Sequence, residues 1–526
     1  MIDQKIKLIT GSLLHDIGKV VYREGSDRRN HSVSGYDFLK EEGKIEDKEI
    51  LDCVRYHHFS EIKSAHLKED NLAYIVYLAD NIAAFADRRK KEDTEEKGFD
   101  LSVPLQSVFN VLNGNNQSFY YQPGDMDDQG KINYPASEKK PFSREFYMKI
   151  CQRMLDNFRG MNWSEEYLNS LLAVMEANLS YMPSSTSNEE LSDISLFDHV
   201  KLTAAISSCI YDYLNENHLS YKTELFDKKD FYDRNAFLLC SMDISGIQSF
   251  IYTISSKNAL KTLRARSFYL EIMMEHIIDF LLDRLQLSRA NLLYSGGGHC
   301  YLLLANTTET VMQIQKFQEE LKEWLLKQFQ TDLFVAFGYV QCTGNAFRNV
   351  PEGSYTELFR KMSKMLSLQK QHRYTAREII RLNNRKEQDY SRECKVCKKI
   401  GHVDEEGVCP LCRKIEKLSK NVLYADFFSV ILENPDERED AMPLPGGYCL
   451  VADDEKKLCR RMENDDYFVR SYSKNKLYTG KHIATKLWVG DYSTGSTFEE
   501  FAREAEGISR IGVLRADVDN LGQAIV

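Results

Sequence analysis

The pattern of apolar and polar positions predicts helices in the N-terminal part of the chain. Up to about residue 105, apolar residues recur every three or four positions, as on helices with one buried face; they include Leu8, Leu13, Leu14, Ile17, Leu72, Ile75, Val76, Ala79 and Ile82. The polar stretch 92–98 closes this region, and residues 121–145, with three prolines and two glycines, are typical of a loop. Further helices are predicted over 144–182 and 196–214.

From residue 236 the pattern changes to strands and helices in alternation. The order is a strand (AFLLCSMD), a turn (ISGIQSFIY), a helix around 263–285, a hairpin (NLLYSGGGHCYLLLA), a helix at 311–329 and a strand at 333–340. This β-α-β-β-α-β order predicts the ferredoxin-like fold of nucleotide polymerase and cyclase palms. The last stretch, ISRIGVLRADVDNLGQAI, resembles the opening of this palm and indicates a second one.

These elements predict an α+β chain with several domains. We expect a helical domain over 1–105, a helical linker over 106–230, the first palm over 231–345, a basic segment with a cysteine-rich region over 346–505, and the start of a second palm over 506–526. Because the sequence stops inside a strong motif, we interpret it as a C-terminally truncated piece.

Composition excludes several classes of protein. The chain carries 69 Lys and Arg against 79 Asp and Glu, a net charge of −10, which argues against a polycation that coats nucleic acid but leaves room for basic patches. It has neither an apolar run long enough for a membrane span nor the apolar core of a signal peptide. We therefore expect a cytoplasmic protein, in which the 12 cysteines do not form a disulfide framework.

Histidine and aspartate residues in the first hundred positions predict a metal site. His15 and Asp16 are adjacent in LLHDIGK, and further candidates are His31, His57, His58 and Asp80. Mixed imidazole and carboxylate ligands suit Mn, Fe, Co or Ni, with Zn also possible. Two such ions could activate a bridging water and hold both oxygens around a phosphodiester. Each histidine alone is better explained as an ordinary surface or core residue, but six candidates in one short helical region favour the metal site.

Four cysteines predict a second metal site of a different kind. CKVC and CPLC place Cys394, Cys397, Cys409 and Cys412 in two knuckles separated by eleven residues. This spacing is typical of a tetrahedral zinc site, and four thiolates leave no open position for catalysis, so the zinc is expected to be structural. The lysines around it could contact nucleic acid or simply face solvent.

The two palm segments differ in their candidate ligands. In the first palm, Asp243 ends the strand, but the hairpin 296–299 reads Gly-Gly-Gly-His and lacks the carboxylate of a catalytic Gly-Gly-Asp-Asp hairpin. It can cradle a ligand but is not expected to catalyse. In the second palm, Asp517 stands where a Mg²⁺ ligand belongs and Asp519 begins the following turn. DxDxxG alone is a weak motif, and a polar turn is the alternative interpretation.

Residues 360–386 are strongly basic, with nine Lys or Arg against one acid, Glu378. A basic helical face can bind phosphates without reading sequence. A solvated helix, or an interface with an acidic subunit, is as well supported by the residues alone.

LLHDIGK and the His57-His58 pair resemble the HD phosphohydrolase superfamily over residues 1 to about 90. The resemblance implies that His15 and Asp16 are catalytic and, with Asp80, form the core ligands. His31, His57 and His58 would complete a two-metal site, and Lys19 would contact substrate phosphate. Many HD enzymes also use a histidine upstream of the doublet. None precedes His15, which implies a missing ligand or a single tightly bound metal.

The order of motifs along the whole chain resembles the large signature subunit of type III-A (Csm) CRISPR interference complexes. The matching stretches are LLHDIGK, SLFDHVKLTAAI, MDISGIQSFIY, SGGGHCYLLLA, CKVC…CPLC and LRADVDNLG. The resemblance implies a subunit that works with guide RNA and target RNA. Pairing of the guide RNA with the target RNA would switch on the cleavage of single-stranded DNA at the HD site, with Mn, Co or Ni as the metal.

The same resemblance implies a second activity, the condensation of ATP into cyclic oligoadenylates by the paired palms with Mg or Mn. Asp517 would be a palm metal ligand. The residues expected to seat nucleotide are Asp243, Ser245, Gly246, Gly297, Gly298, His299 and Asp519. Because the catalytic hairpin would lie beyond residue 526, we expect the chain as given to lack this reaction.

Two other functions share these motifs. A stand-alone second-messenger enzyme would combine an HD phosphodiesterase with a cyclase-like palm and would need no guide RNA. A scaffold with vestigial HD and palm domains would bind no stoichiometric metal at the HD residues.

Overall fold

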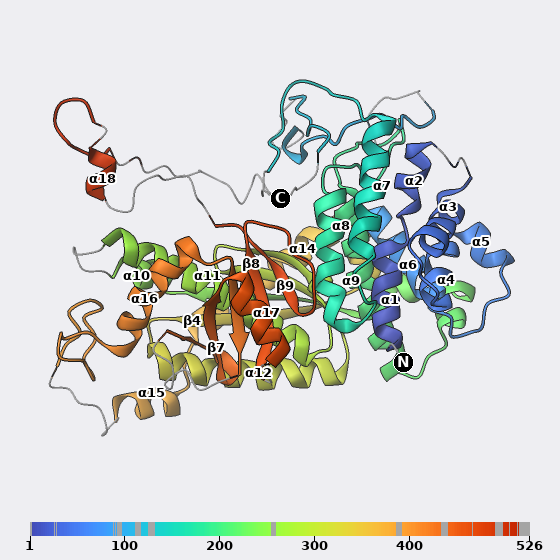
Figure 1. Cartoon of the computed structure of the whole chain (residues 1–526). Helices are drawn as coiled ribbons and strands as arrows, with labels where there is room; N and C mark the ends of the chain where they lie inside the picture. Colours follow the sequence, from blue (N-terminus) through green and yellow to red (C-terminus); the bar gives the residue numbers. More distant parts are fainter. Residues whose placement is uncertain are drawn as a thin grey trace.

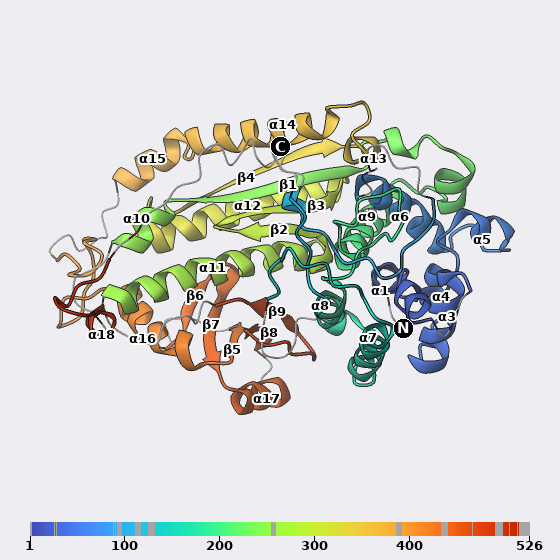
Figure 2. The same cartoon turned by 90° about the horizontal axis from the view of Figure 1, so that it is seen from above.

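A computed structural model describes residues 3–25, 27, 29–87, 89, 91, 97–110, 117–124, 132–253, 259–384, 392–432, 440–464, 467–489, 498–503, 505–512 and 514. Figures 1 and 2 show the N-terminal helices at one end of the molecule and two sheets with their covering helices at the other. Within these residues, none of the helices combines the length and the apolar character needed to cross a membrane.

Short helices build the N-terminal region, as its apolar periodicity predicts. They are α1 (Gln4–Leu14), α2 (Gly18–Glu24), α3 (His31–Asp37), α4 (Lys48–Arg55), α5 (Phe59–Ser64) and α6 (Ala73–Asp87), with a π-helical turn η1 (Phe38–Glu42) after α3. Asp3 and Asp47 cap α1 and α4 by accepting hydrogen bonds from backbone amides of the first turn.

The bundle continues through α7 (Arg144–Phe158), α8 (Leu168–Leu179) and α9 (Leu196–Glu216). Helix α9 packs against both α1 and α6, and one buried cluster joins Leu8, Ile82 and Ala205. The helices predicted for 144–182 and 196–214 are therefore present, but α9 does not stand apart as a linker. Its apolar residues face the N-terminal helices and the first sheet together, so the core of the N-terminal region crosses the expected boundary at residue 105.

The first palm has the predicted order of elements. Its parts are β1 (Phe237–Ser245), α10 (Ile247–Tyr252), α11 (Ala259–Arg284), the 3₁₀ turn η7 (Arg289–Asn291), β2 (Leu292–Gly296), β3 (His299–Ala305), α12 (Thr308–Phe329) and β4 (Phe334–Cys342). The antiparallel sheet has the order β2-β3-β1-β4, which is ferredoxin-like. Alternate residues of β1 enter different cores, Leu238 and Cys240 on one face, Phe237 and Leu239 on the other. Helices therefore cover both faces.

A second sheet lies where the sequence analysis foresaw only a basic segment and a zinc region. After α13 (Gly344–Phe347), α14 (Ser354–Gln371), α15 (Ala376–Asn383) and α16 (Pro410–Tyr424) come β5 (Phe427–Ile431), β6 (Met442–Leu444), β7 (Tyr448–Asp453), α17 (Glu455–Asn464), β8 (Phe468–Lys474) and β9 (Ile483–Leu487). The strand order is β6-β7-β5-β8-β9. In Figure 2 this sheet lies on the side of α11 away from the first sheet, and one apolar cluster joins both.

The second palm can be followed only in part. Helix α18 (Phe498–Ala502) precedes it, and residues 505–512 and 514 are not in a strand. The two predicted ligands there, Asp517 and Asp519, lie outside the described residues.

Candidate functional site

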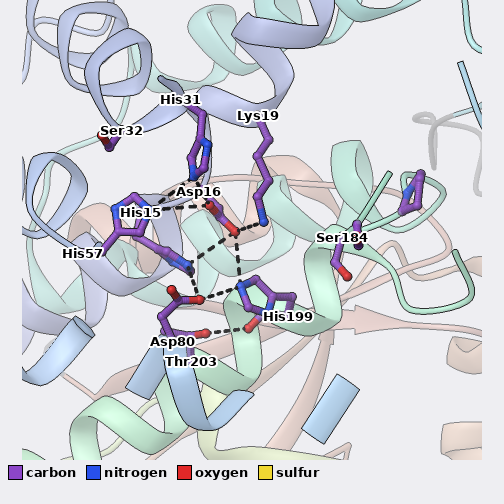
Figure 3. A network of polar contacts seen from close by, with 12 residues as sticks. His15, Asp16, Lys19, His31, Ser32, His57, Asp80, Ser184, His199 and Thr203 are labelled. Carbon is purple, nitrogen blue, oxygen red and sulfur yellow. Dashed lines mark hydrogen bonds and ion pairs between the residues drawn. The ribbon is translucent and has the colours of Figure 1, made fainter. Parts of the chain in front are cut away.

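Two groups of metal-ligand side chains meet in the N-terminal bundle. One consists of His15, Asp16, Asp80 and His199, and the other of His31, His57 and His58; within each group the ligand atoms lie within 4.8 Å of one another. Figure 3 shows Asp16 between the groups, with Lys19 directed at its carboxylate. The fold thus brings together all six metal ligands predicted from sequence.

The LLHDIGK segment positions the first of these side chains. His15 ends α1, Asp16 follows in the turn, and Gly18 begins α2. A Cβ atom on Gly18 would lie only 1.8 Å from the His31 carbonyl oxygen. Only glycine therefore allows α2 and α3 to come close enough to bring His31 to the site.

The first group is held by four elements. His199 Nε2 lies 3.2 Å from Asp16 Oδ2 and 3.1 Å from Asp80 Oδ1. His15 Nε2 lies 3.5 Å and 3.6 Å from the same two oxygen atoms. Such separations are those of ligands that share one ion at bond lengths of about 2.1 Å. His15 Nε2 is buried and faces both carboxylates.

Asp16 also faces the second group with its other oxygen. Its Oδ1 lies 3.3 Å from His31 Nε2 and 3.7 Å from His57 Nε2. Within the group, His31 Nε2 lies 2.7 Å from His58 Nε2 and 3.4 Å from His57 Nε2. Because one carboxylate presents an oxygen to each group, the residues fit two divalent ions bridged by Asp16.

Backbone carbonyls orient two of the imidazoles. His15 Nδ1 lies 2.7 Å from the Ser12 carbonyl oxygen, and His57 Nδ1 lies 2.7 Å from that of Val54. A ring nitrogen that donates to a carbonyl leaves the lone pair of the other nitrogen for a metal. In both residues that other nitrogen, Nε2, faces the carboxylates.

Electrostatics favour the metal-binding forms of these groups. Burial alone would raise the pKa of Asp16, but Lys19 and His15, with hydrogen bonds from His199 and His31, bring it well below its usual range. Hydrogen bonds from His15 and His199 similarly overcome burial and lower the pKa of Asp80. Burial lowers the pKa of His57 and His58. Ionised carboxylates and neutral imidazoles are the forms that bind a cation.

His199 is the candidate ligand that the sequence analysis missed. The expectation of a missing ligand rested on the absence of a histidine before His15, whereas α9 supplies His199 from far downstream. The side chain is 1% exposed. The motif SLFDHVKLTAAI already contained it, and its position among the apolar residues of a helix was the available signal.

The predicted zinc ligands also converge. Cys394, Cys397, Cys409 and Cys412 form one group, with Cys397 Sγ and Cys409 Sγ 3.7 Å apart. Zn–S bonds of about 2.3 Å in a tetrahedron imply sulfur separations of about 3.8 Å. Hydrogen bonds from Cys409 and Cys412 lower the pKa of the Cys397 thiol well below its usual value. The buried Arg266 donates from Nη2 to Cys412 Sγ at 3.3 Å and so joins this group to α11.

The first palm brings its candidate nucleotide ligands to one end of the sheet. Asp243 and His299 are paired across β1 and β3, and His299 Nδ1 lies 3.5 Å from Asp243 Oδ2. Ser245 ends β1, Gly246 precedes α10, and Gly297 and Gly298 form the hairpin turn with φ of 61° and 81°. From the basic segment, Lys370 Nζ lies 2.6 Å from Asp243 Oδ2. Hydrogen bonds from His299 and Lys370 outweigh burial and lower the pKa of Asp243.

Comparisons with known proteins agree with this arrangement. The HD domain family model matches residues 1–84, and the model of Csm1 subunit domain B matches residues 236–385. The chain is 40% identical over 547 residues to the CRISPR system single-strand-specific deoxyribonuclease Cas10/Csm1 (subtype III-A) of Enterococcus italicus, covering 100% of this chain and 71% of that protein. The chain belongs to the Cas10/Csm1 family of subtype III-A.

A second member of the Cas10/Csm1 family matches at the same identity. The Mycobacterium tuberculosis protein of the same name is 40% identical over 570 residues, with 99% of this chain and 69% of that protein covered. Among solved structures, the apo Csm1-Csm4 cassette matches with a TM-score of 0.70 at 24% identity, over 97% of this chain and 64% of that one. The Csm1-Csm4 cassette in complex with cA4 matches with a TM-score of 0.71 at 24% identity, over 99% and 65%. The chain thus has the Csm1 fold and spans slightly under two thirds of those structures.

Proposed function

We propose that this chain is the nuclease subunit of a type III-A interference complex and that it cleaves single-stranded DNA at the HD residues. The observation that carries the proposal is the position of Asp16, which presents one oxygen to each ligand group. Relatives at 40% identity carry the name of a single-strand-specific deoxyribonuclease. A carboxylate that offers one oxygen to each side can hold two ions close enough together for the two-metal hydrolysis of a phosphodiester.

The residues divide the work of this reaction. Bound divalent ions would supply a water of lowered pKa and neutralise charge on the phosphate. His15, Asp80 and His199 would hold one ion, and His31, His57 and His58 the other. The imidazole and carboxylate mixture favours Mn, Co or Ni. Lys19 Nζ, 2.5 Å from Asp16 Oδ2, is placed to bind a phosphate oxygen beside the shared carboxylate.

Replacement of Asp16 tests the nuclease. We expect Asp16→Asn to lower the rate of manganese-dependent cleavage of single-stranded DNA at least about 100-fold, because both ions lose their common ligand. The matched control is Asp156→Asn, an exposed carboxylate on α7 that pairs with Arg159. Equal rates for Asp16→Asn and the wild type would refute the assignment.

For the first palm we propose nucleotide binding, specifically ATP, as part of a cyclic oligoadenylate synthase in the complete protein. The support is that Asp243, His299 and Lys370 converge beside the glycine turn. A likeness in fold to Csm1-Csm4 cassettes with ATP and with cA4 agrees with it. Asp517 as Mg²⁺ ligand and Asp519 in the following turn belong to this proposal.

Binding of ATP with Mg²⁺ to the full chain tests the palm assignment. We expect His299→Ala to weaken binding several-fold, because the side chain lies beside Asp243 at the hairpin. His218→Ala, an exposed histidine beyond α9, is the control. Unchanged affinity in His299→Ala would remove this residue from the nucleotide site.

The remaining assignments follow from family membership and are proposals too. They are a structural zinc at the four cysteines, a Csm4-like partner subunit, guide and target RNA, and a cytoplasmic location. Co-purification of RNA and small subunits with the chain would favour this reading over a stand-alone second-messenger enzyme. Stoichiometric metal at the HD residues would count against a scaffold.

A further inference from the structure

A cavity of about 610 Å³ opens directly beside the second ligand group. Lys19 and His31 line one end of it, so the cavity is continuous with the metal residues. Its volume falls in the range of small-ligand sites, roughly 300–1,000 Å³. Any substrate whose phosphate reaches Asp16 must place its neighbouring groups here or in open solvent.

The two walls come from distant parts of the chain. Residues of α2 and α3, including Tyr22, form one wall together with Arg29 and Asn30. The other wall is formed by Phe99, Leu101, Ser184, Ser185, Thr186, Ser187, Glu189 and Glu190. Arg23, which is buried, fixes the second wall by donating from Nη1 to the Pro183 carbonyl at 2.8 Å and from Nη2 to the Ser184 carbonyl at 3.3 Å. Figure 3 shows Ser184 across from Lys19.

Phe99 is the most unusual residue of the cavity. Its side chain is 76% exposed, although it is energetically unfavourable for a phenylalanine ring to stay in water. Its backbone is nevertheless held, because Phe99 pairs with Ser187. The amide of Asn188 donates to the Gly98 carbonyl at 2.9 Å, and the amide of Asp100 donates to the Thr186 carbonyl at 2.9 Å. The Phe99 side chain thus lines the cavity from a backbone that is held in place.

The lining chemistry matches that of an unpaired nucleotide. Serine and threonine hydroxyls and the carboxylates of Glu189 and Glu190 lie on the same wall as Phe99, while the cations lie on the wall of α2 and α3. A base can stack on the ring and hydrogen-bond to the polar groups, while its phosphate stays beside Lys19. Any of the bases can stack on an aromatic side chain, because each has an aromatic face. The base must first be free of the stack of a duplex.

We propose that this cavity binds the nucleotide next to the scissile phosphate of single-stranded DNA, with Phe99 stacked on its base. The inference rests on the proposed nuclease and adds to it the physical basis of strand preference. A base inside a duplex is already stacked and paired, so it cannot enter the cavity without the cost of unstacking.

Replacement of Phe99 tests the stacking contact. We expect Phe99→Ala to weaken binding of a single-stranded oligonucleotide about 5- to 150-fold, the equivalent of about 1–3 kcal/mol for one stacked base. Phe99→Trp restores binding because the ring is kept. Phe109→Ala is the control, since Phe109 is 62% exposed and does not line the cavity. Metal content and turnover at saturating DNA stay within about threefold of the wild type, as expected of a residue that positions substrate.

Two further measurements separate this inference from the nuclease itself. The first uses an oligonucleotide that carries 2-aminopurine and the Asp16→Asn variant. We expect the fluorescence of 2-aminopurine to be quenched when the base stacks on Phe99. In the Asp16→Asn, Phe99→Ala double variant this quenching should be lost. Unchanged binding and quenching without Phe99 would overturn the inference and leave the nuclease standing. The second compares the affinity of Phe99→Ala for single-stranded and for duplex DNA. An equal loss of affinity for both would also overturn the inference. If Asp16→Asn still cleaves, the nuclease assignment falls, and the quenching alone decides whether the cavity binds a base.

Discussion

At the scale of single residues, Asp16 and His199 define the metal centre. Asp16 can face two ligand groups because it lies in the turn between α1 and α2, where its side chain is free of either helix face. His199 completes the first group only because α9 crosses α1 and α6. Both side chains are almost fully buried, and a divalent cation bound between them would add to the stabilisation that Lys19 gives the Asp16 carboxylate.

Loss of His199 should therefore reduce metal binding and leave the zinc site untouched. We expect His199→Ala to weaken manganese binding at least about 10-fold, because one ligand of the first group is removed. Metal analysis of the purified chain measures manganese and zinc together, so the four-cysteine site serves as an internal standard. His218→Ala is the surface control. Full manganese content in His199→Ala would show that His199 is not a ligand.

At the scale of elements, α11 connects the two sheets. Its His276 is buried against the second sheet, where Nε2 donates to the Pro445 carbonyl at 3.0 Å. Burial, together with repulsion from Arg470, lowers the pKa of His276 to about 3. The hydrogen bond to Pro445 acts in the opposite direction but is the weaker influence. The imidazole is thus neutral in the folded state over most of the acid range.

This histidine predicts a loss of stability in acid. Below its unfolded pKa of about 6.5 the unfolded chain binds a proton that the folded chain does not, so the folded state loses stability as the pH falls from about 6.5 toward about 3. The loss from this group is about 1.4 kcal/mol per pH unit. The measurement is the urea midpoint of unfolding for the wild type and for His276→Gln. The two midpoints should converge as the pH falls from 7 to 5, because only the wild type carries this imidazole. Parallel pH profiles would contradict the prediction.

At the scale of the whole molecule, one buried ion network joins the palm to the second sheet. Arg289, in η7, donates from Nε to Asp279 at 2.8 Å and from Nη2 to Glu275 at 2.6 Å, both on α11. Tyr472 of β8 donates to Asp279 at 2.6 Å. Helix α9 makes a similar connection between the metal centre and β3 of the palm. The N-terminal helices, the first palm and the second sheet are therefore packed together through shared helices.

Removal of Arg289 should weaken this connection strongly. Arg289→Met removes the cation that bonds the buried Asp279 and the partly buried Glu275, which costs on the order of 3–5 kcal/mol. Urea denaturation followed by tyrosine fluorescence measures the shift of the transition midpoint. Arg360→Met is the control: Arg360 is 67% exposed and pairs with Glu357, so its loss should cost less than about 1 kcal/mol. Similar shifts in the two variants would refute a structural role for the network.

Short-range patterns made much of this molecule readable from its sequence. The histidine and aspartate doublet, the two cysteine knuckles and the β-α-β-β-α-β order each depend on residues near one another in the chain, where spacing alone limits geometry. The second sheet was missed, although FFSVI is a continuous buried strand, because a short apolar run does not distinguish strand from helix.

The sequence by itself thus determined the residue types of both metal sites, the palm topology and the family. Only the tertiary structure decided that His199 joins the first ligand group, that Lys370 pairs with Asp243, and that Phe99 lines a cavity beside the metal residues. Each of these depends on a contact between segments far apart in the chain. Such contacts are set by how apolar faces of helices and sheets pack together, and no local spacing specifies them.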